Sequence, residues 1–324
     1  MKWTFDDGWK LYEAPLHWGK DRLAEVLRKD DGAYACSLPC DVRMPLIKAG
    51  VIRDPVQADY FRESLWVEQR SWWFVKEFDW QGGEYDAVEL TLDRLDFGAD
   101  ILLNGVPIGR HDSVHYPFVK DVRKSLVVGR NTLAVRLTCG LETVTDLDVA
   151  GIDGMAFTEE GNGWRDRGDR RRAFLRKPQY VFGWDWCPRV ATCGIGSAEL
   201  RAYRRAAIRN VMFSTVSVGG AAARVKVVAT VESLLPTSTQ DADVAAELSF
   251  DGRPAVRAQQ SDVLLLSGLN HIEFELEVPD AKLWWPNGYG GQPLYDLAIT
   301  VKAGDAVATH GQKAGIRTLE LDTT

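Results

Sequence analysis

Short segments of alternating apolar residues, separated by turn residues, are the feature that most restricts the fold of this 324-residue chain. Residues 99–103 and 106–108 flank Asn104-Gly105, two residues that tolerate a positive φ, so they predict a tight β-hairpin. In residues 131–137 apolar and polar side chains alternate as on a half-buried strand. Closely spaced strands of this kind predict an all-β chain built from antiparallel sandwiches.

The strand pattern becomes plainer after about residue 204, which predicts two domains. Residues 1–204 mix strands, which begin near Ser71, with loops and helical pieces. From Ile208 onward about seven short strands follow, the number that an immunoglobulin-like sandwich needs. We therefore expect such a sandwich over residues 205–311.

Two short helices are expected in the first domain. Residues 21–28 have the apolar spacing of an amphipathic helix. Residues 44–49 follow Asp41, a candidate N-cap, and precede Gly50, which is placed to end the helix.

The charge balance and the cysteines exclude several classes of protein. A formal net charge of −7 argues against a nucleic-acid partner, which would require a basic face for phosphates. No apolar run reaches the ~20 residues of a membrane helix, and the N-terminus lacks the apolar region of a signal peptide. Five thinly spread cysteines favour neither a disulfide framework nor a zinc site. We expect a cytoplasmic protein without metal or cofactor.

An aromatic run at residues 176–188, RKPQYVFGWDWCP, places Asp185 between Trp184 and Trp186. A carboxylate accepts hydrogen bonds from sugar hydroxyls, and an indole covers the apolar C–H face of a sugar ring. The alternative is that the tryptophans pack in the core while Asp185 caps a turn. The charged run at residues 165–172 carries both signs and favours a solvated loop over an RNA-binding tract.

Six ordered motifs resemble those of the β-mannosidases of glycoside hydrolase family 2. The run at 176–188 is similar to R-K-x-x-Y-x-F-G-W-D-W-x-P, and it keeps Trp184 and Asp185. Two departures are Cys40, where the motif has Gly, and Ala314, where it has Phe. The other five motifs lie at residues 39–55, 72–74, 102–109, 285–295 and 315–318.

The resemblance implies a domain order. Residues 1–204 would be a galactose-binding-like jelly roll, residues 205–311 the immunoglobulin-like sandwich, and residues 312–324 the start of a connection to a C-terminal (β/α)₈ barrel. In the family that barrel carries both catalytic glutamates, and no part of this chain has the strand–helix alternation of a barrel. We therefore assign no catalytic residue and expect the chain to be inactive alone.

The resemblance also implies a substrate and a site. The chain would be the non-catalytic N-terminal part of a retaining exo-β-mannosidase that acts on β-mannoside oligosaccharides. Asp185 would bind sugar hydroxyls, Trp184 would shape the pocket around the ring, and Arg176 would orient Asp185. Two alternatives remain: an exo-β-glucosaminidase or β-galactosidase of the same family, or a freestanding carbohydrate-binding or scaffolding module. The other aromatic residues of the run are expected to pack in the core: Tyr180, Phe182 and Trp186.

Overall fold

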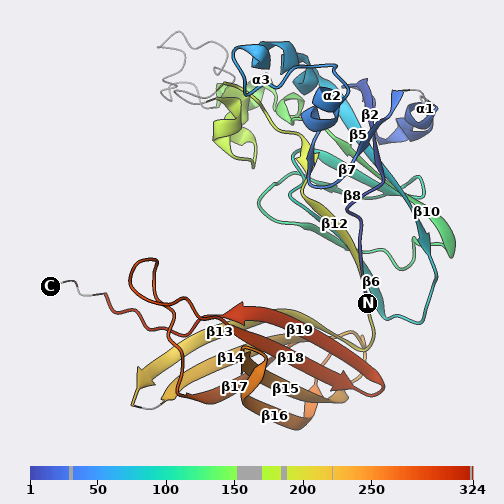
Figure 1. The fold of residues 1–324 in the computed structure, drawn as a ribbon. Coiled ribbons are helices and arrows are strands. Elements are labelled where there is room, and N and C mark those ends of the chain that lie inside the picture. The colour runs from blue at the N-terminus through green and yellow to red at the C-terminus, as the bar shows by residue number, and fades with distance from the viewer. Residues whose placement is uncertain (29–31, 152–169, 184–187, 221, 322, 324) are drawn as a thin grey trace. The chain divides into compact units, whose positions relative to one another are not determined.

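The computed structural model describes residues 1–28, 32–151, 170–183, 188–220, 222–321 and 323 (Figure 1). The chain divides into two compact units. The first comprises Met1–Gly83 and Val88–Arg201, and the second comprises Glu84–Ala87 and Ala202–Thr324. Strands dominate both units, which confirms the all-β prediction.

Two large antiparallel sheets make up most of the first unit. Its strands are β1 Lys2–Thr4, β2 Trp9–Pro15, β3 Tyr34–Cys36, β5 Arg70–Trp80, β6 Ala87–Asp93, β7 Ala99–Leu103, β8 Val106–His111, β9 Phe118–Asp121, β10 Gly129–Leu137 and β12 Ser197–Tyr203. One sheet has the order β1-β12-β6-β9, and the other has the order β3-β2-β5-β10-β7-β8. Trp3 of the first sheet contacts Trp80 of the second, with ring centroids 4.9 Å apart. The two sheets therefore pack against each other as a sandwich.

Strand β5 is the centre of the larger sheet and is apolar on both faces. Trp72, Trp73 and Phe74 are all fully buried. Because successive side chains on a strand point to opposite faces, Trp72 and Phe74 share one face while Trp73 points to the other. That second face is covered by helix α1 (Leu23–Leu27), whose Leu23 and Val26 pack in one cluster with Trp73. Much of the tryptophan surplus thus serves packing.

Both predicted helices are present, but the predicted N-cap of the second helix, Asp41, is wrong. Helix α2 (Arg43–Lys48) ends before Gly50, whose φ of 71° suits a helix C-terminus. Its N-cap is Val42 and has no side-chain cap. Asp41 instead pairs its backbone in a two-stranded sheet of β4 (Cys40–Asp41) and β11 (Gly194–Ile195). The remaining helical turns are η1 Lys20–Arg22, η3 Tyr60–Gln69, η4 Leu141–Thr143, α3 Asp146–Ala150, η6 Arg170–Phe174 and η7 Gln179–Phe182.

The β-hairpin predicted around Asn104-Gly105 is confirmed. Strands β7 and β8 pair across Asn104 and Gly105, which have φ values of 53° and 78°. The Asn104 side chain also ties the hairpin to its neighbour: its amide nitrogen donates to Asn131 Oδ1 at 2.9 Å, and its oxygen accepts from Thr132 N at 2.9 Å.

The second unit is the immunoglobulin-like sandwich. Its seven strands are β13 Ala206–Gly219, β14 Ala222–Ser233, β15 Gln240–Phe250, β16 Arg253–Leu265, β17 Gly268–Pro279, β18 Tyr295–Ala303 and β19 Ala306–Ala314. They form a three-stranded sheet, β13-β14-β17, and a four-stranded sheet, β16-β15-β18-β19 (Figure 1). Alternate residues of β14 and β17, such as Val227 and Phe274, are buried in the shared core. Strand β19 continues to Ala314 and Ile316 is fully buried, so the sandwich extends past the boundary expected at residue 311.

None of the described helices is long and apolar enough to cross a membrane.

Candidate functional site: a segment anchored by buried charges

Of the three predicted site residues, only Arg176 lies within the residues that the structure describes. Trp184, Asp185 and Trp186 lie outside the described residues. Of the two other aromatic residues in the run, Phe182 is buried as expected, whereas the packing role expected for Tyr180 is wrong, because Tyr180 is 64% exposed.

Arg176 is exposed and lines a hollow of about 270 Å³ in the first unit. Its backbone bridges that of Ser113, and its Nη1 donates to the Tyr116 hydroxyl at 3.4 Å. Arg110 and Asp112, which precede Ser113 in the chain, line the hollow as well. A guanidinium presented in this way can donate to hydroxyl or carboxylate oxygens. The predicted contact of Arg176 with Asp185 stays a prediction.

Lys177, the next residue, is fully buried and carries a charge into the interior. Its Nζ lies 2.5 Å from Asp96 Oδ1 and donates to the carbonyl oxygen of Thr192 at 2.8 Å. The Thr192 hydroxyl donates to the same Asp96 carboxylate. Because Thr192 lies beyond residues 184–187 in the chain, this cluster ties the segment before them to the segment after them.

A second buried cluster surrounds Arg43 and Glu68. Arg189 donates to Glu68 Oε2 from Nη2 at 2.5 Å and from Nε at 3.0 Å. Arg43 Nη2 faces Glu68 Oε1 at 3.7 Å. Arg43 also donates from Nη1 to the carbonyl oxygen of Ala191 at 2.6 Å and from Nε to Ser64 Oγ at 3.3 Å. The segment after residues 184–187 is therefore held at two places, Arg189 and Ala191.

Asp41 extends this second cluster to strand β11. Its Oδ1 accepts from Arg43 N and its Oδ2 from Cys193 N, both at 2.9 Å. Burial raises the pKa of the Asp41 carboxyl, while the nearby Arg43 guanidinium and these two backbone donors oppose the rise. The carboxyl thus serves as a backbone anchor.

Phe182 joins the two clusters. Its ring is fully buried among apolar neighbours that include Phe97, Leu175 and Val181. Lys177 Nζ lies 5.7 Å and Arg189 Cζ 5.6 Å from the ring centroid. Both cations are within the range of a cation–π interaction, so the ring stabilises charges that water does not reach freely.

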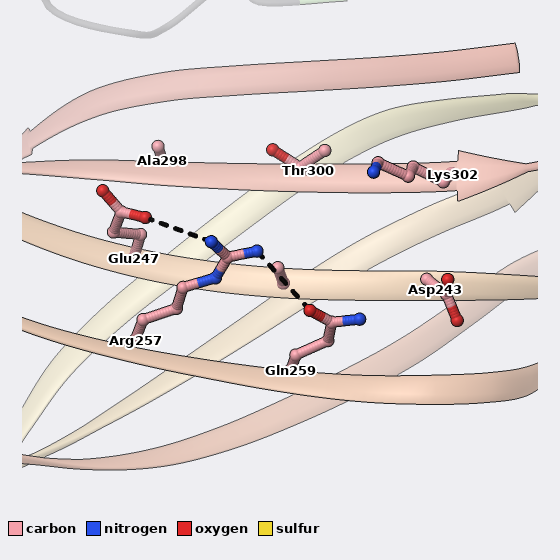
Figure 2. A pocket seen from close by; sticks show the side chains of 8 residues that line it. Asp243, Glu247, Arg257, Gln259, Ala298, Thr300 and Lys302 are labelled. Atoms are coloured by element: carbon pink, nitrogen blue, oxygen red, sulfur yellow. Dashed lines mark hydrogen bonds and ion pairs between the residues drawn. The ribbon is translucent and has the colours of Figure 1, made fainter.

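Two further hollows lie in the second unit. One, of about 160 Å³, crosses the outer face of β15, β16 and β18, where Arg257 meets Glu247 at 3.9 Å and Gln259 at 3.4 Å (Figure 2). Along β15 and β18 the side chains that line it alternate with buried ones, as on any solvent-facing sheet. The other, of about 230 Å³, is apolar and is lined by Trp284, Trp285 and Tyr289.

The described residues around this segment hold their buried carboxylates in ion pairs, as Asp96 pairs with Lys177 and Glu68 with Arg189. The described residues contain no cluster of three or more His, Cys, Asp or Glu side chains able to hold a metal ion. The arrangement can hold a chain segment in place and present Arg176.

The sequence pattern indicated Arg176 but not the buried charges that hold the segment around it. Arg189 and Glu68 are 121 residues apart, and Arg43 and Ala191 are 148 apart. No local pattern reports a pair at such a separation. The available signal was weak: Glu68 is a charge directly after the short apolar run Leu65-Trp66-Val67.

Comparisons with known proteins agree with this architecture. A family model for the glycosyl hydrolase 2 galactose-binding domain-like fold matches residues 19–197, and a model for glycosyl hydrolases family 2 matches residues 206–317. These matches confirm the jelly roll and the immunoglobulin-like sandwich.

Relatives and solved structures extend well beyond this chain. It is 29% identical to β-mannosidase B of Aspergillus terreus over 320 residues, which cover 97% of this chain and 35% of the relative. The crystal structure of a β-D-mannosidase from Dictyoglomus thermophilum matches with a TM-score of 0.78 and 26% identity, over 99% of this chain and 37% of that one. A Bacteroides uniformis β-glucuronidase matches at 14% identity and a TM-score of 0.65, over 99% of this chain and 33% of that one, which shows the fold alone.

The chain thus spans about a third of the length of the proteins that it matches, and it corresponds to the N-terminal domain region of β-mannosidase-like proteins. Because the first family model alone covers more than half of the residues and the second follows it in order, the chain belongs to glycosyl hydrolase family 2.

Proposed function

We propose that this chain is the non-catalytic N-terminal part of a retaining exo-β-mannosidase and forms part of the pocket for a terminal β-D-mannose. The observation that carries the proposal is the likeness over nearly the whole chain to proteins named β-mannosidase, in sequence and in fold. The longer polypeptide would supply the two carboxylates of a retaining mechanism, which lie ~5 Å apart.

Asp185, Trp184 and Arg176 are the proposed sugar contacts. Asp185 accepts hydrogen bonds from mannose hydroxyls, and each such bond to a charged acceptor contributes about 1.5–3 kcal/mol. Trp184 covers the apolar face of the ring. Arg176 supports the proposal because it is exposed and lines a polar hollow at the start of the same segment.

The test is hydrolysis of an aryl β-mannoside by the longer polypeptide with Asp185→Ala. We expect kcat/KM to fall by at least about a hundredfold, the loss of two such hydrogen bonds, with little change in melting temperature. Asp241→Ala is the matched control, since Asp241 is an exposed aspartate of the second unit. A large loss of stability with unchanged kinetics would support the alternative that Asp185 caps a turn and does not contact the sugar.

Two measurements separate the alternatives. If the longer polypeptide hydrolyses an aryl β-glucosaminide or β-galactoside in preference to the mannoside, the proposed substrate would change to that sugar. A native polypeptide whose intact mass equals the 36.2 kDa of this chain would favour a freestanding carbohydrate-binding module. We expect the isolated 324-residue chain to show no turnover of the mannoside.

A further inference from the structure

Two buried ionic clusters hold the chain on either side of residues 184–187. On one side Lys177, whose side chain is 0% exposed, meets Asp96 and the Thr192 carbonyl. On the other side Arg189 meets Glu68, whose side chain is 5% exposed. Each cluster also binds the backbone that follows residue 187. Lys177 donates to the carbonyl oxygen of Thr192, and Arg43 donates to that of Ala191.

Stability alone is a poor reason for such clusters. Removing an ion from water costs several kcal/mol, and replacing a buried ion pair by apolar side chains of similar volume is often neutral or stabilising. What charged hydrogen bonds provide that apolar contacts do not is direction, because donor and acceptor must meet at one distance and angle. Clusters on both sides of one short segment therefore point to a requirement for its placement.

The anchoring of Lys177 has a consequence for the proposed pocket. The fully buried Lys177 fixes the backbone beside it, and the adjacent Arg176 is exposed at the hollow.

We propose that Lys177 and Arg189 are positioning residues for the mannose-contacting segment, with Asp96 and Glu68 as their buried counter-ions. They touch no sugar and act through Arg176 and Asp185. The proposal rests on the proposed function, since it takes Asp185 as a sugar contact.

A double-mutant cycle in the longer polypeptide tests the proposal. We expect Lys177→Met to lower kcat/KM for an aryl β-mannoside by about tenfold or more at a temperature where the variant is folded. If Lys177 acts through Asp185, adding Lys177→Met to Asp185→Ala lowers kcat/KM further by less than about threefold, because the two effects are not independent.

Arg136→Met is the matched control. Arg136 is also a largely buried cation of the first unit, paired with Asp100 at 3.1 Å with side chains 12% and 20% exposed. It belongs to β10 and donates to the carbonyl oxygens of Leu16 and Trp18. We expect Arg136→Met to lower the melting temperature while leaving kcat/KM within about twofold, and to be additive with Asp185→Ala.

A charge-neutral variant separates position from stability. Lys177→Met/Asp96→Asn removes both charges, so we expect much of the lost melting temperature to return. Placement would stay lost, so kcat/KM should remain low. Recovery of kcat/KM in parallel with melting temperature, or full additivity with Asp185→Ala, would overturn the proposal.

Hydrogen exchange on the 324-residue chain gives a readout that does not depend on mannoside. Lys177→Met should raise exchange in peptides covering 178–183 and 188–195 and leave strands β15 and β18 unchanged. Unchanged exchange in the first two peptides would refute the anchoring itself. If exchange rises while Asp185→Ala proves kinetically silent, the anchoring stands, but the proposed function fails and with it the positioning role.

Discussion

Neutralising Glu68 tests how much the second buried cluster contributes to stability. Glu68 is the anion between Arg189, 2.5 Å away, and Arg43, 3.7 Å away, with side chains 5%, 15% and 3% exposed. Glu68→Gln keeps the shape and one acceptor oxygen but leaves two cations without a counter-charge. Breaking a buried pair by removing one partner costs about 3–5 kcal/mol, and the retained amide oxygen favours the lower end, about 3 kcal/mol.

That loss is measurable as a melting-temperature shift. For a unit of this size, about 2–4 °C are lost per kcal/mol, so Glu68→Gln should lower the transition of the first unit by about 6–12 °C. Calorimetry is the assay because it resolves the transitions of the two units. The matched control is Glu77→Gln, which breaks the exposed pair of Glu77 and Arg130, with side chains 50% and 72% exposed.

An exposed pair contributes ~0–1 kcal/mol, so the control should shift the transition by less than about 4 °C. Equal shifts for the two variants would refute the reasoning, because they would mean that burial adds nothing to the cost of losing the counter-charge. A stabilised Glu68→Gln variant would show that desolvation of the carboxylate outweighs its attraction to both arginines.

Other changes test packing and thiol chemistry. Gly194→Ala should cost about 1–3 kcal/mol in thermal unfolding, because its Cβ would collide with the carbonyl oxygen of Cys40, whereas Gly219→Ala, with open space around it, should be neutral or slightly stabilising. A hydrogen bond from the Cys40 thiol lowers the pKa of Cys36, so iodoacetamide at pH 8 should alkylate Cys36 before the buried Cys40, Cys139 and Cys193, which peptide mass spectrometry will show. Burial raises the pKa of Cys139 to about 11, so its thiol should stay unmodified in the folded chain, and unfolding free energy should fall as pH rises from about 9 to about 11, where the unfolded chain alone ionises it. Rapid alkylation of Cys139 under native conditions, or unfolding free energy that does not fall over that pH interval, would contradict the assignment.

Local patterns in the sequence determined the strands and their turns. The alternation in residues 131–137 became β10, and Asn104-Gly105 became the β7–β8 turn. Gly50 ended helix α2 as predicted. These features depend on a period of two along a strand or on the φ preference of one residue, and both are properties of neighbouring residues.

The tertiary structure alone decided the roles of the polar residues. Asp41 was predicted to cap helix α2, and its Oδ1 does accept from Arg43 N, but its Oδ2 accepts from Cys193 N, 152 residues away in the chain and next to β11. No sequence pattern gave a role to Lys177, the residue after Arg176, yet it is the buried partner of Asp96. A charged side chain can be buried only where the fold supplies its counter-ion and acceptors, and those come from strands and loops that no local pattern connects. The sequence therefore determined which elements form, and the packing of distant elements determined which charges hold the segment that we propose contacts mannose.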